Sequence, residues 1–301
     1  MKRLACGNLC SFLWLALIVG CGGPSAPATQ PPAVATDSSS PRAASNDGRA
    51  EASAPKSASG EQGKSGAAKA AVSDLDRALG LAKHALNTLE KLEDYTGRFC
   101  KRERVGDTLL PEECSAVKLR HKPFSVYLRV LEPAPAAGQE VIYVAGRNNG
   151  NLIAHTTGFG SKAIGRVSLA PDGFIATRGN RYTIKDVGLV NLVRKLLELG
   201  DRKELFRESK VTIEKVEFNE RPCTQVEISS PKPVGDFRLA IARIVLDAEW
   251  DVPVHFESHE WPTDGGEKSL LSETYSYFDL KFDVGLDDHD FDPDNSEYAF
   301  P

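Results

Sequence analysis

The order of hydrophobic and polar positions divides the chain near residue 73 into an irregular first part and a patterned second part. From Leu75 to Leu89, apolar residues recur at alternating spacings of four and three, which is the pattern of one face of an α-helix. Ser73 suits the N-cap position, with Asp76 three residues later. We therefore predict an amphipathic helix over about Asp74–Asp94, whose apolar stripe needs a surface to cover.

Further along the chain the period changes to two, which is typical of β-strands. Phe124 and Val126 alternate with polar residues and predict a strand that continues to Val130. The pair Asn149-Gly150 suits a tight turn with positive φ, so it predicts a hairpin between two strands. The strands of this hairpin span 140–145 and 151–156, and further strand-like runs span 211–218, 224–229, 237–246, 252–261 and 270–284.

A second helix is predicted over 187–199, where the chain is apolar on most sides and where Gly200 suits a helix C-terminus. The strands after it have turn residues between them and no intervening helix, which favours antiparallel meanders. The predicted fold class is therefore α+β, with a large curved antiparallel sheet and two or three helices on its concave face. One globular domain is expected, over residues 73–301.

The first residues have the pattern of an export signal. Two cations precede an apolar stretch over 9–19, which is shorter than the roughly 20 residues that a membrane-spanning helix needs. The segment Ile18–Cys21 resembles the bacterial lipobox, so we predict a cleaved signal over 1–20 and acylation of Cys21. The alternative is an ordinary signal with an incidental cysteine. Gly22 stands where an aspartate retains some lipoproteins at the inner membrane, which favours an outer-membrane or outward-facing location.

Composition predicts a tether between the anchor and the domain. Of the 51 residues over 22–72, 35 are Ala, Ser, Pro or Gly, so this segment cannot bury enough apolar surface to fold. We therefore predict a lipidated cysteine followed by a disordered tether over 21–72. The domain after it carries 30 Lys and Arg against 38 Asp and Glu, and this acidic balance disfavours nucleic acid as a partner.

Several segments of the domain resemble a family of bacterial envelope proteins known only as domain of unknown function 1571. They span 95–99, 101–106, 118–127 and 139–144, and the closing run over 275–291 fits the same family. More distantly, the order of elements resembles the periplasmic lipoprotein carriers and their outer-membrane receptor. These share a long N-terminal helix, an aromatic strand, a basic residue before proline, a second aromatic strand and a glycine-turned hairpin.

The second resemblance implies an open half-barrel that holds acyl chains beneath its helices. It implies a ligand site that contains Phe99, Leu119, Lys122, Phe124, Val126 and Tyr127. Lys122 stands where the carriers usually have arginine, and lysine lacks the planar fork of that side chain, so a solvated turn lysine is the alternative. The helices and sheet could equally enclose a filled core.

The sequence contains no recognisable catalytic or metal-binding motif with the spacing that such chemistry needs. The domain has no Gly-x-Ser-x-Gly or His-Glu-x-x-His motif and no evident carboxylate pair, so no catalytic residue, cofactor or metal is predicted. His255, Glu257 and His259 share one strand face, but successive members lie about 6.6 Å apart, too far for one ion. Residues 158–162 lack the order of a phosphate-binding loop.

An acidic cluster near the end of the chain invites a calcium interpretation. It contains Asp287, Asp288, Asp290, Asp292 and Asp294. However, Pro293 stands where a calcium loop needs glycine, and Ala299 stands where it needs a bidentate glutamate. We therefore predict a solvated acidic tail.

The cysteines predict one disulfide, because export places the domain in an oxidising compartment. Once the signal is removed and Cys21 is acylated, Cys100, Cys114 and Cys223 remain. A hairpin that turns at 106–108 would place Cys100 opposite Cys114, and Cys223 should then stay reduced. Three independent buried thiols are the alternative.

These features favour a non-enzymatic, membrane-anchored lipoprotein of the cell envelope that binds a hydrophobic ligand between sheet and helices. A lipid or a lipoprotein acyl chain is the expected ligand. The first alternative is a protein-interaction or structural lipoprotein that docks a partner. A hydrolase is the third hypothesis.

Overall fold

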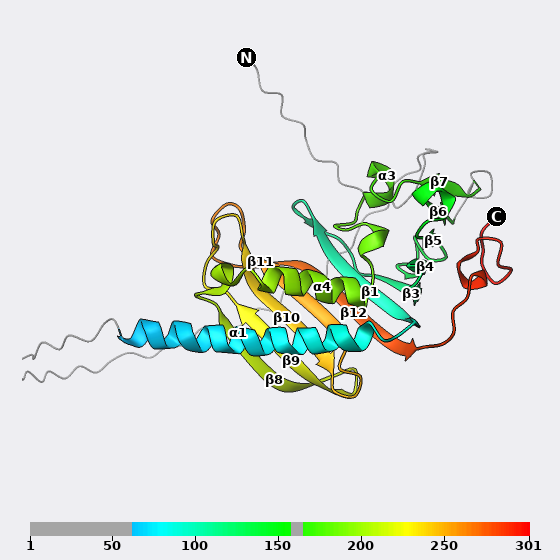
Figure 1. Ribbon diagram of the computed structural model, residues 1–301. Coiled ribbons are helices and arrows are strands. Elements are labelled where there is room, and N and C mark those ends of the chain that lie inside the picture. The colour runs from blue at the N-terminus through cyan, green and yellow to red at the C-terminus, as the bar shows by residue number, and fades with distance from the viewer. Residues whose placement is uncertain (1–61, 158–164) are drawn as a thin grey trace, which may run out of the picture.

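The computed structural model describes residues 62–157 and 165–301. The expected signal peptide, Cys21 and most of the tether lie outside these residues, as does the segment over 158–162. Within the described part, the chain forms one twelve-stranded sheet whose paired strands are all antiparallel, with helices packed on one face (Figure 1). The α+β fold class is confirmed.

The sheet consists of two meanders joined at its centre. Its order is β7-β6-β5-β4-β3-β1-β12-β11-β10-β9-β8, with β2 paired to β1, so β7 and β8 are open edges and the sheet is not a closed barrel. Most successive strands therefore pair as hairpins. The exceptions are β2, which pairs with β1 and leaves β3 to pair with β1 as well, and the connection from β7 to β8, which joins opposite edges of the sheet. The last strand returns to pair with the first. The strands are β1 (Asp94–Val105), β2 (Thr108–Leu109), β3 (Glu113–Arg120), β4 (Ser125–Glu132), β5 (Glu140–Val144), β6 (Leu152–His155), β7 (Val167–Leu169), β8 (Lys210–Phe218), β9 (Arg221–Ser229), β10 (Leu239–Asp247), β11 (Pro253–Glu260) and β12 (Leu270–Phe282).

The α-helices of the described part are α1 (Gln62–Leu89), α3 (Phe174–Thr177) and α4 (Leu189–Gly200). Figure 1 shows α1 and α4 side by side across the same face of the sheet. Short 3-10 helices occupy η1 (Asn148–Gly150), η2 (Ile184–Asp186), η3 (Lys203–Phe206) and η4 (His289–Phe291). None of the helices described is long and apolar enough to cross a membrane.

The observed α1 differs from its prediction at both ends. It starts at Gln62 instead of about Asp74, because the segment before Ser73 is rich in alanine, which has the highest helix propensity even where it offers little apolar surface. It ends at Leu89 because Asp94 already begins β1. The buried carboxylate of Asp94 accepts hydrogen bonds from the backbone N–H groups of Val284 and Leu286, at 2.7 and 2.8 Å. Those bonds hold the start of β1 beside the chain that leaves β12.

Two hydrophobic clusters join the helices to the sheet. In the first, Leu89 of α1 and Val193 of α4 pack with Tyr95, Phe99 and Tyr277 from the two central strands. The second lies between α1 and the half of the sheet that contains β8 to β11. The apolar stripe predicted for the first helix therefore covers the sheet, as its period requires.

A glycine allows α4 to begin close to the sheet. Gly188 has φ +115°, and a Cβ atom there would lie 2.7 Å from Cδ1 of Leu119. The next residue, Leu189, donates its backbone N–H to the hydroxyl of Tyr95 at 3.2 Å. Both contacts fix the N-terminus of α4 against β1 and β3.

We expect Gly188→Ala to lower the free energy of unfolding by about 2 kcal/mol, because it adds a steric clash to a strained φ. Gly146→Ala is the matched control, since Gly146 has φ +81° but open space around its missing Cβ. Denaturant unfolding of both variants checks this. If both variants lose the same free energy of unfolding, the destabilisation comes from the positive φ and not from the contact with Leu119.

Candidate functional site

A cavity of about 240 Å³ lies between the inner face of the sheet and the segment that runs from α3 to α4. Side chains from both meanders form its wall on the sheet side, and α3, η2 and α4 contribute the other wall. Most of the lining residues are apolar, among them Phe99, Leu128, Val141 and Leu192. A cluster of charged and hydroxyl-bearing side chains lines the rest.

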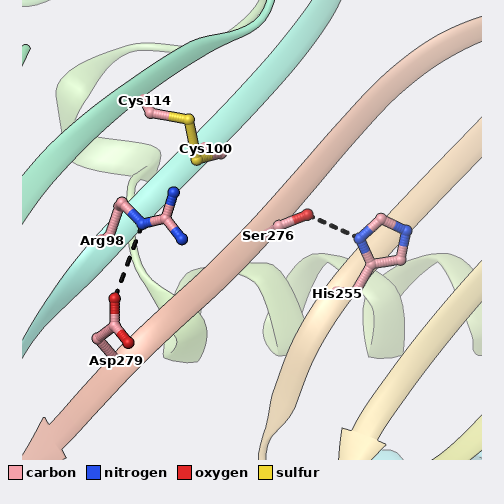
Figure 2. Close-up of a disulfide and its surroundings, with 6 residues drawn as sticks. All are labelled: Arg98, Cys100, Cys114, His255, Ser276 and Asp279. Atoms are coloured by element: carbon pink, nitrogen blue, oxygen red, sulfur yellow. Dashed lines mark hydrogen bonds and ion pairs between the residues drawn. A yellow bond between two sulfur atoms is a disulfide. The ribbon is translucent and has the colours of Figure 1, made fainter. Parts of the chain in front are cut away.

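Strand alternation decides which side chains reach the cavity. Phe99 and Tyr277 line it, so their chain neighbours Cys100 and Ser276 point to the opposite face of the sheet. Figure 2 shows that opposite face, with α4 passing behind the strands. There Cys100 is bonded to Cys114, and His255 makes a hydrogen bond to Ser276 at 2.8 Å. The cavity and the disulfide are therefore on opposite sides of the sheet.

Two buried carboxylates face each other at the polar part of the cavity wall. Glu103 of β1 and Glu273 of β12 are direct partners across the strands and are only 5% and 7% exposed. The hydroxyl of Tyr275 lies between them, 2.5 Å from Oε1 of Glu103 and 3.0 Å from Oε2 of Glu273. No carboxylate pair was expected from the sequence, but the folded chain contains one. The strand register brings together two glutamates that are far apart in the chain.

Cationic groups offset part of this charge. Nε of Arg181 lies 3.2 Å from Glu273, and the backbone N–H of Arg181 donates to Glu103 at 3.2 Å. Nζ of Lys101 lies 3.8 Å from Glu103 and 3.7 Å from Glu113. Burial raises the pKa of Glu273 above its ordinary value, although Arg181 opposes the shift. Glu273 is therefore harder to ionise than a glutamate in water.

An aromatic side chain lines the same end. Tyr182 is 37% exposed, and its hydroxyl lies 3.4 Å from Oε1 of Glu273. Burial, reinforced by the charge of Glu273, raises the pKa of Tyr182 to about 12. The ammonium of Lys195 from α4 lies 4.0 Å from the centre of the tyrosine ring. This cation–π contact connects α4 to the polar end of the cavity.

A second buried polar group lies at the β5–β6 side of the cavity. Glu140 accepts a hydrogen bond from Tyr127 at 2.7 Å, and its other oxygen lies 2.6 Å from Nε2 of His155. The backbone N–H of Ala299 donates to that oxygen at 2.9 Å. Burial would raise the pKa of Glu140, but the hydrogen bonds from His155, Tyr127 and Ala299 outweigh it and lower the pKa. Glu140 therefore acts as an anchor for the C-terminal segment.

The six residues that the carrier resemblance implies as ligand contacts lie in different surroundings. Phe99 lines the cavity. Leu119 and Val126 are fully buried in the core beside it, and Phe124 packs against that core. The cavity lies further along β4, where Leu128 and Val130 face inward in the same alternation. The six residues that the resemblance implies are Phe99, Leu119, Lys122, Phe124, Val126 and Tyr127.

Tyr127 and Lys122 lie away from the cavity. Tyr127 points to the outer face of the sheet, where its ring stacks on Tyr298 with 4.1 Å between ring centres. Lys122 is exposed in the turn between β3 and β4, before a cis peptide bond to Pro123. Neither position is among the residues that line the cavity.

The histidines of β11 are held in local contacts. Nε2 of His259 lies 2.9 Å from Glu257, and Arg243 donates to the same carboxylate at 2.5 Å. His255 instead bonds Ser276. In the part of the chain that is described, no group of three or more His, Cys, Asp or Glu residues is arranged to hold a metal ion.

The acidic cluster near the C-terminus is docked on the sheet, although Asp287, Asp288 and Asp294 are exposed to solvent as predicted. Asp288 forms ion pairs with Arg120 at 2.9 Å and Arg147 at 2.5 Å, and Asp290 pairs with Lys118 at 2.6 Å. Beside these pairs, apolar residues of the same segment cover the outer face of β4 and β5. The positive charges on β3 therefore hold the C-terminal segment against the sheet.

The cysteines pair across β1 and β3. Cys100 and Cys114 are direct register partners and form a disulfide with an S–S distance of 2.04 Å. Cys223 is a buried free thiol. Burial raises the pKa of that thiol, which disfavours the thiolate form.

Fold and site together define an open-sheet α+β protein with an amphipathic internal cavity. The chain belongs to the family described as "Protein of unknown function (DUF1571)", whose model matches residues 92–300. A search of curated proteins finds no match.

Solved structures with a similar arrangement are distant in sequence. The lipoprotein LppX of Mycobacterium tuberculosis is 12% identical, with a TM-score of 0.40, over 69% of this chain and 96% of that chain. A putative outer membrane lipoprotein-sorting protein domain from Vibrio parahaemolyticus is 10% identical, with a TM-score of 0.33, over 70% and 97%. A LolA superfamily protein from Nitrosomonas europaea is 11% identical, with a TM-score of 0.32, over 70% and 97%.

Proposed function

We propose that this protein is an exported, lipid-anchored envelope protein whose domain binds an apolar or amphipathic ligand in the cavity beneath α4, without catalysing a reaction on it. The observation that supports this most directly is the cavity itself, which has an apolar wall and one cluster of polar groups. Binding pockets for small molecules combine these two features. The export signal and Cys21 of the sequence would tether such a domain at a membrane surface, where lipids are available.

The cavity volume sets the size of the ligand. At about 240 Å³ it exceeds the void of about 150 Å³ that holds benzene in an engineered core. It lies just below the range that starts at about 300 Å³ for drug-sized ligands. The cavity therefore suits a single hydrocarbon chain better than a lipid with several chains fully enclosed.

Filling the cavity is expected to weaken ligand binding strongly. Ala176→Trp on α3 and Leu192→Trp on α4 each place a larger side chain in the wall. We expect each to weaken the binding of the apolar fluorophore N-phenylnaphthylamine by about tenfold or more, since the loss of about 1.4 kcal/mol of contact energy already has that effect. Fluorescence titration of the purified, delipidated protein measures this.

Ala248→Trp is the matched control, because Ala248 is exposed in the turn between β10 and β11 and does not line the cavity. It should leave the affinity unchanged within about twofold. Native mass spectrometry of protein purified from membranes should also detect a bound lipid. If the fluorophore binds equally to all three variants, or if the protein binds neither fluorophore nor lipid, the proposal is wrong.

A further inference from the structure

We propose that the cavity selects single-chain amphiphiles whose polar head donates hydrogen bonds, an ammonium or a hydroxyl group, over those with a carboxylate or phosphate head. This inference rests on the proposed function and specifies its ligand. The head would lie against Glu103, Glu273 and Tyr275, which line the cavity, and the hydrocarbon chain would extend along the apolar wall toward Leu128 and Val141.

The charge balance around the head position disfavours an anion. Three carboxylates, those of Glu103, Glu113 and Glu273, line this part of the wall, and the cations that contact them are Lys101 and Arg181. Each of these two cations already contacts one or two of the carboxylates, at 3.2 to 3.8 Å. The ammonium of Lys195 is nearby, but it pairs with Asp186 at 3.0 Å. An entering carboxylate or phosphate would therefore add negative charge beside buried negative charge, without a cation reserved for it.

The hydroxyl of Tyr275 cannot donate to both Glu103 and Glu273 at once, although Glu273 also accepts from Ser258 and Tyr182, at 3.2 and 3.4 Å. Tyr275 has one hydroxyl proton but lies within hydrogen-bond distance of both Glu103 and Glu273. If both carboxylates are ionised, one of these two contacts lacks a proton. A proton on Glu273 supplies the missing donor, and the raised pKa of this buried group agrees with that assignment. A ligand that brings its own donor can take the place of this proton.

An ammonium or hydroxyl head can supply the proton that one of these two contacts lacks. It can donate to the carboxylate oxygens and leave Tyr275 bonded to Glu103. Charge-assisted hydrogen bonds of this kind are about twice as strong as neutral ones, and they are stronger still away from water. Carboxylate and phosphate heads bring acceptors only and compete with the glutamates for the same donors.

Competition between probes with the same chain length tests the inference. Dodecylamine, dodecanol, dodecanoate and dodecyl phosphate are each titrated against protein loaded with N-phenylnaphthylamine at neutral pH. We expect the amine to displace the fluorophore at a concentration about tenfold lower than dodecanoate or dodecyl phosphate, a difference of about 1.4 kcal/mol. Dodecanol should lie between them.

Substitutions of the carboxylates test whether they cause the preference for the amine head group. The double substitution Glu103→Gln/Glu273→Gln keeps the side-chain size and is expected to reduce the amine preference to about twofold, with each displacement compared to that variant's own fluorophore affinity. Tyr275→Phe, which removes the bridging hydroxyl, tests the same site if the double variant does not fold. Glu198→Gln, on the exposed side of α4, is the control and should retain the full preference.

The outcomes separate this inference from the proposed function. Fluorophore binding with equal displacement by all four probes, or with better displacement by the anions, would overturn the head-group inference and leave the cavity as a binding site. A preference that persists in the double variant would also overturn it. Absence of fluorophore binding to the unmodified protein would overturn both.

Discussion

Replacing Asp247 with alanine is expected to lower the free energy of unfolding by about 3 kcal/mol, because it removes one partner of a buried ion pair. Asp247 is 1% exposed and accepts two hydrogen bonds from Arg221, at 2.5 and 3.1 Å. The backbone N–H groups of Glu249 and Trp250 also donate to it, at 2.9 and 3.0 Å. One carboxylate thus joins the start of β9 to the turn after β10.

The matched control is Glu249→Ala. Glu249 pairs with the same Arg221 at 2.8 Å, but its side chain is 71% exposed, so its loss should cost less than about 1 kcal/mol. Urea unfolding, followed by tryptophan fluorescence, compares the two variants with the unmodified protein. Equal losses for Asp247→Ala and Glu249→Ala would contradict the expected role of burial.

The contribution of Asp247 should also depend on pH. Burial alone would raise the pKa of Asp247, but the hydrogen bonds from Arg221 and the two backbone groups lower it below the ordinary value of 3.8. A carboxyl with a lowered folded-state pKa stabilises the protein above its unfolded-state pKa and loses that effect as pH falls through the folded-state pKa. The difference between the unmodified protein and Asp247→Ala should therefore be constant near neutral pH and shrink below about pH 4.

Local patterns in the sequence predicted most of the strands. The alternation after Phe124 corresponds to β4, and the Asn149-Gly150 turn lies between β5 and β6, where Asn148, Asn149 and Gly150 have positive φ. The segment over 187–199 forms α4, which ends at Gly200. These elements depend on periods of two or 3.6 residues and on turn chemistry, which short stretches of sequence contain.

The candidate site could not be predicted in the same way, because it depends on pairing between distant segments. Glu103 and Glu273 meet only because the last strand returns to pair with the first. No local pattern marks that return. The sequence did contain one local signal of the site. Glu103 in β1 and Glu273 in β12 each occupy a position whose side chain points to the inner face of the sheet by strand alternation.

Long-range charge pairing also explains why the docking of the C-terminal segment was not predicted. The aspartates after residue 286 have the composition of a solvated tail, yet basic residues of β3 bind them. Lys118 and Arg120 alternate with buried residues on the opposite face, so strand alternation alone places their charges on the outer face. Combining that alternation with the acidic run would have suggested the contact.

Loss of the disulfide is the second large effect that we expect. Cys100 and Cys114 are separated by 14 residues, and closing a loop of about 15 residues contributes roughly 3 kcal/mol in the chain-entropy model. Cys100→Ser/Cys114→Ser should therefore lower the free energy of unfolding by about that amount. A reducing agent should lower the stability of the unmodified protein to a similar extent and leave the double variant unchanged.

The location of the disulfide makes this test independent of ligand binding. Both sulfurs lie on the face of the sheet opposite α4, so the variant should keep its affinity for N-phenylnaphthylamine under conditions where it remains folded (Figure 2). Non-reducing peptide mapping of protein exported by cells checks the pairing directly. A cross-link that involves Cys223, or free thiols at all three positions, would contradict it, because the register places Cys223 on β9 opposite Asp247 and far from the pair.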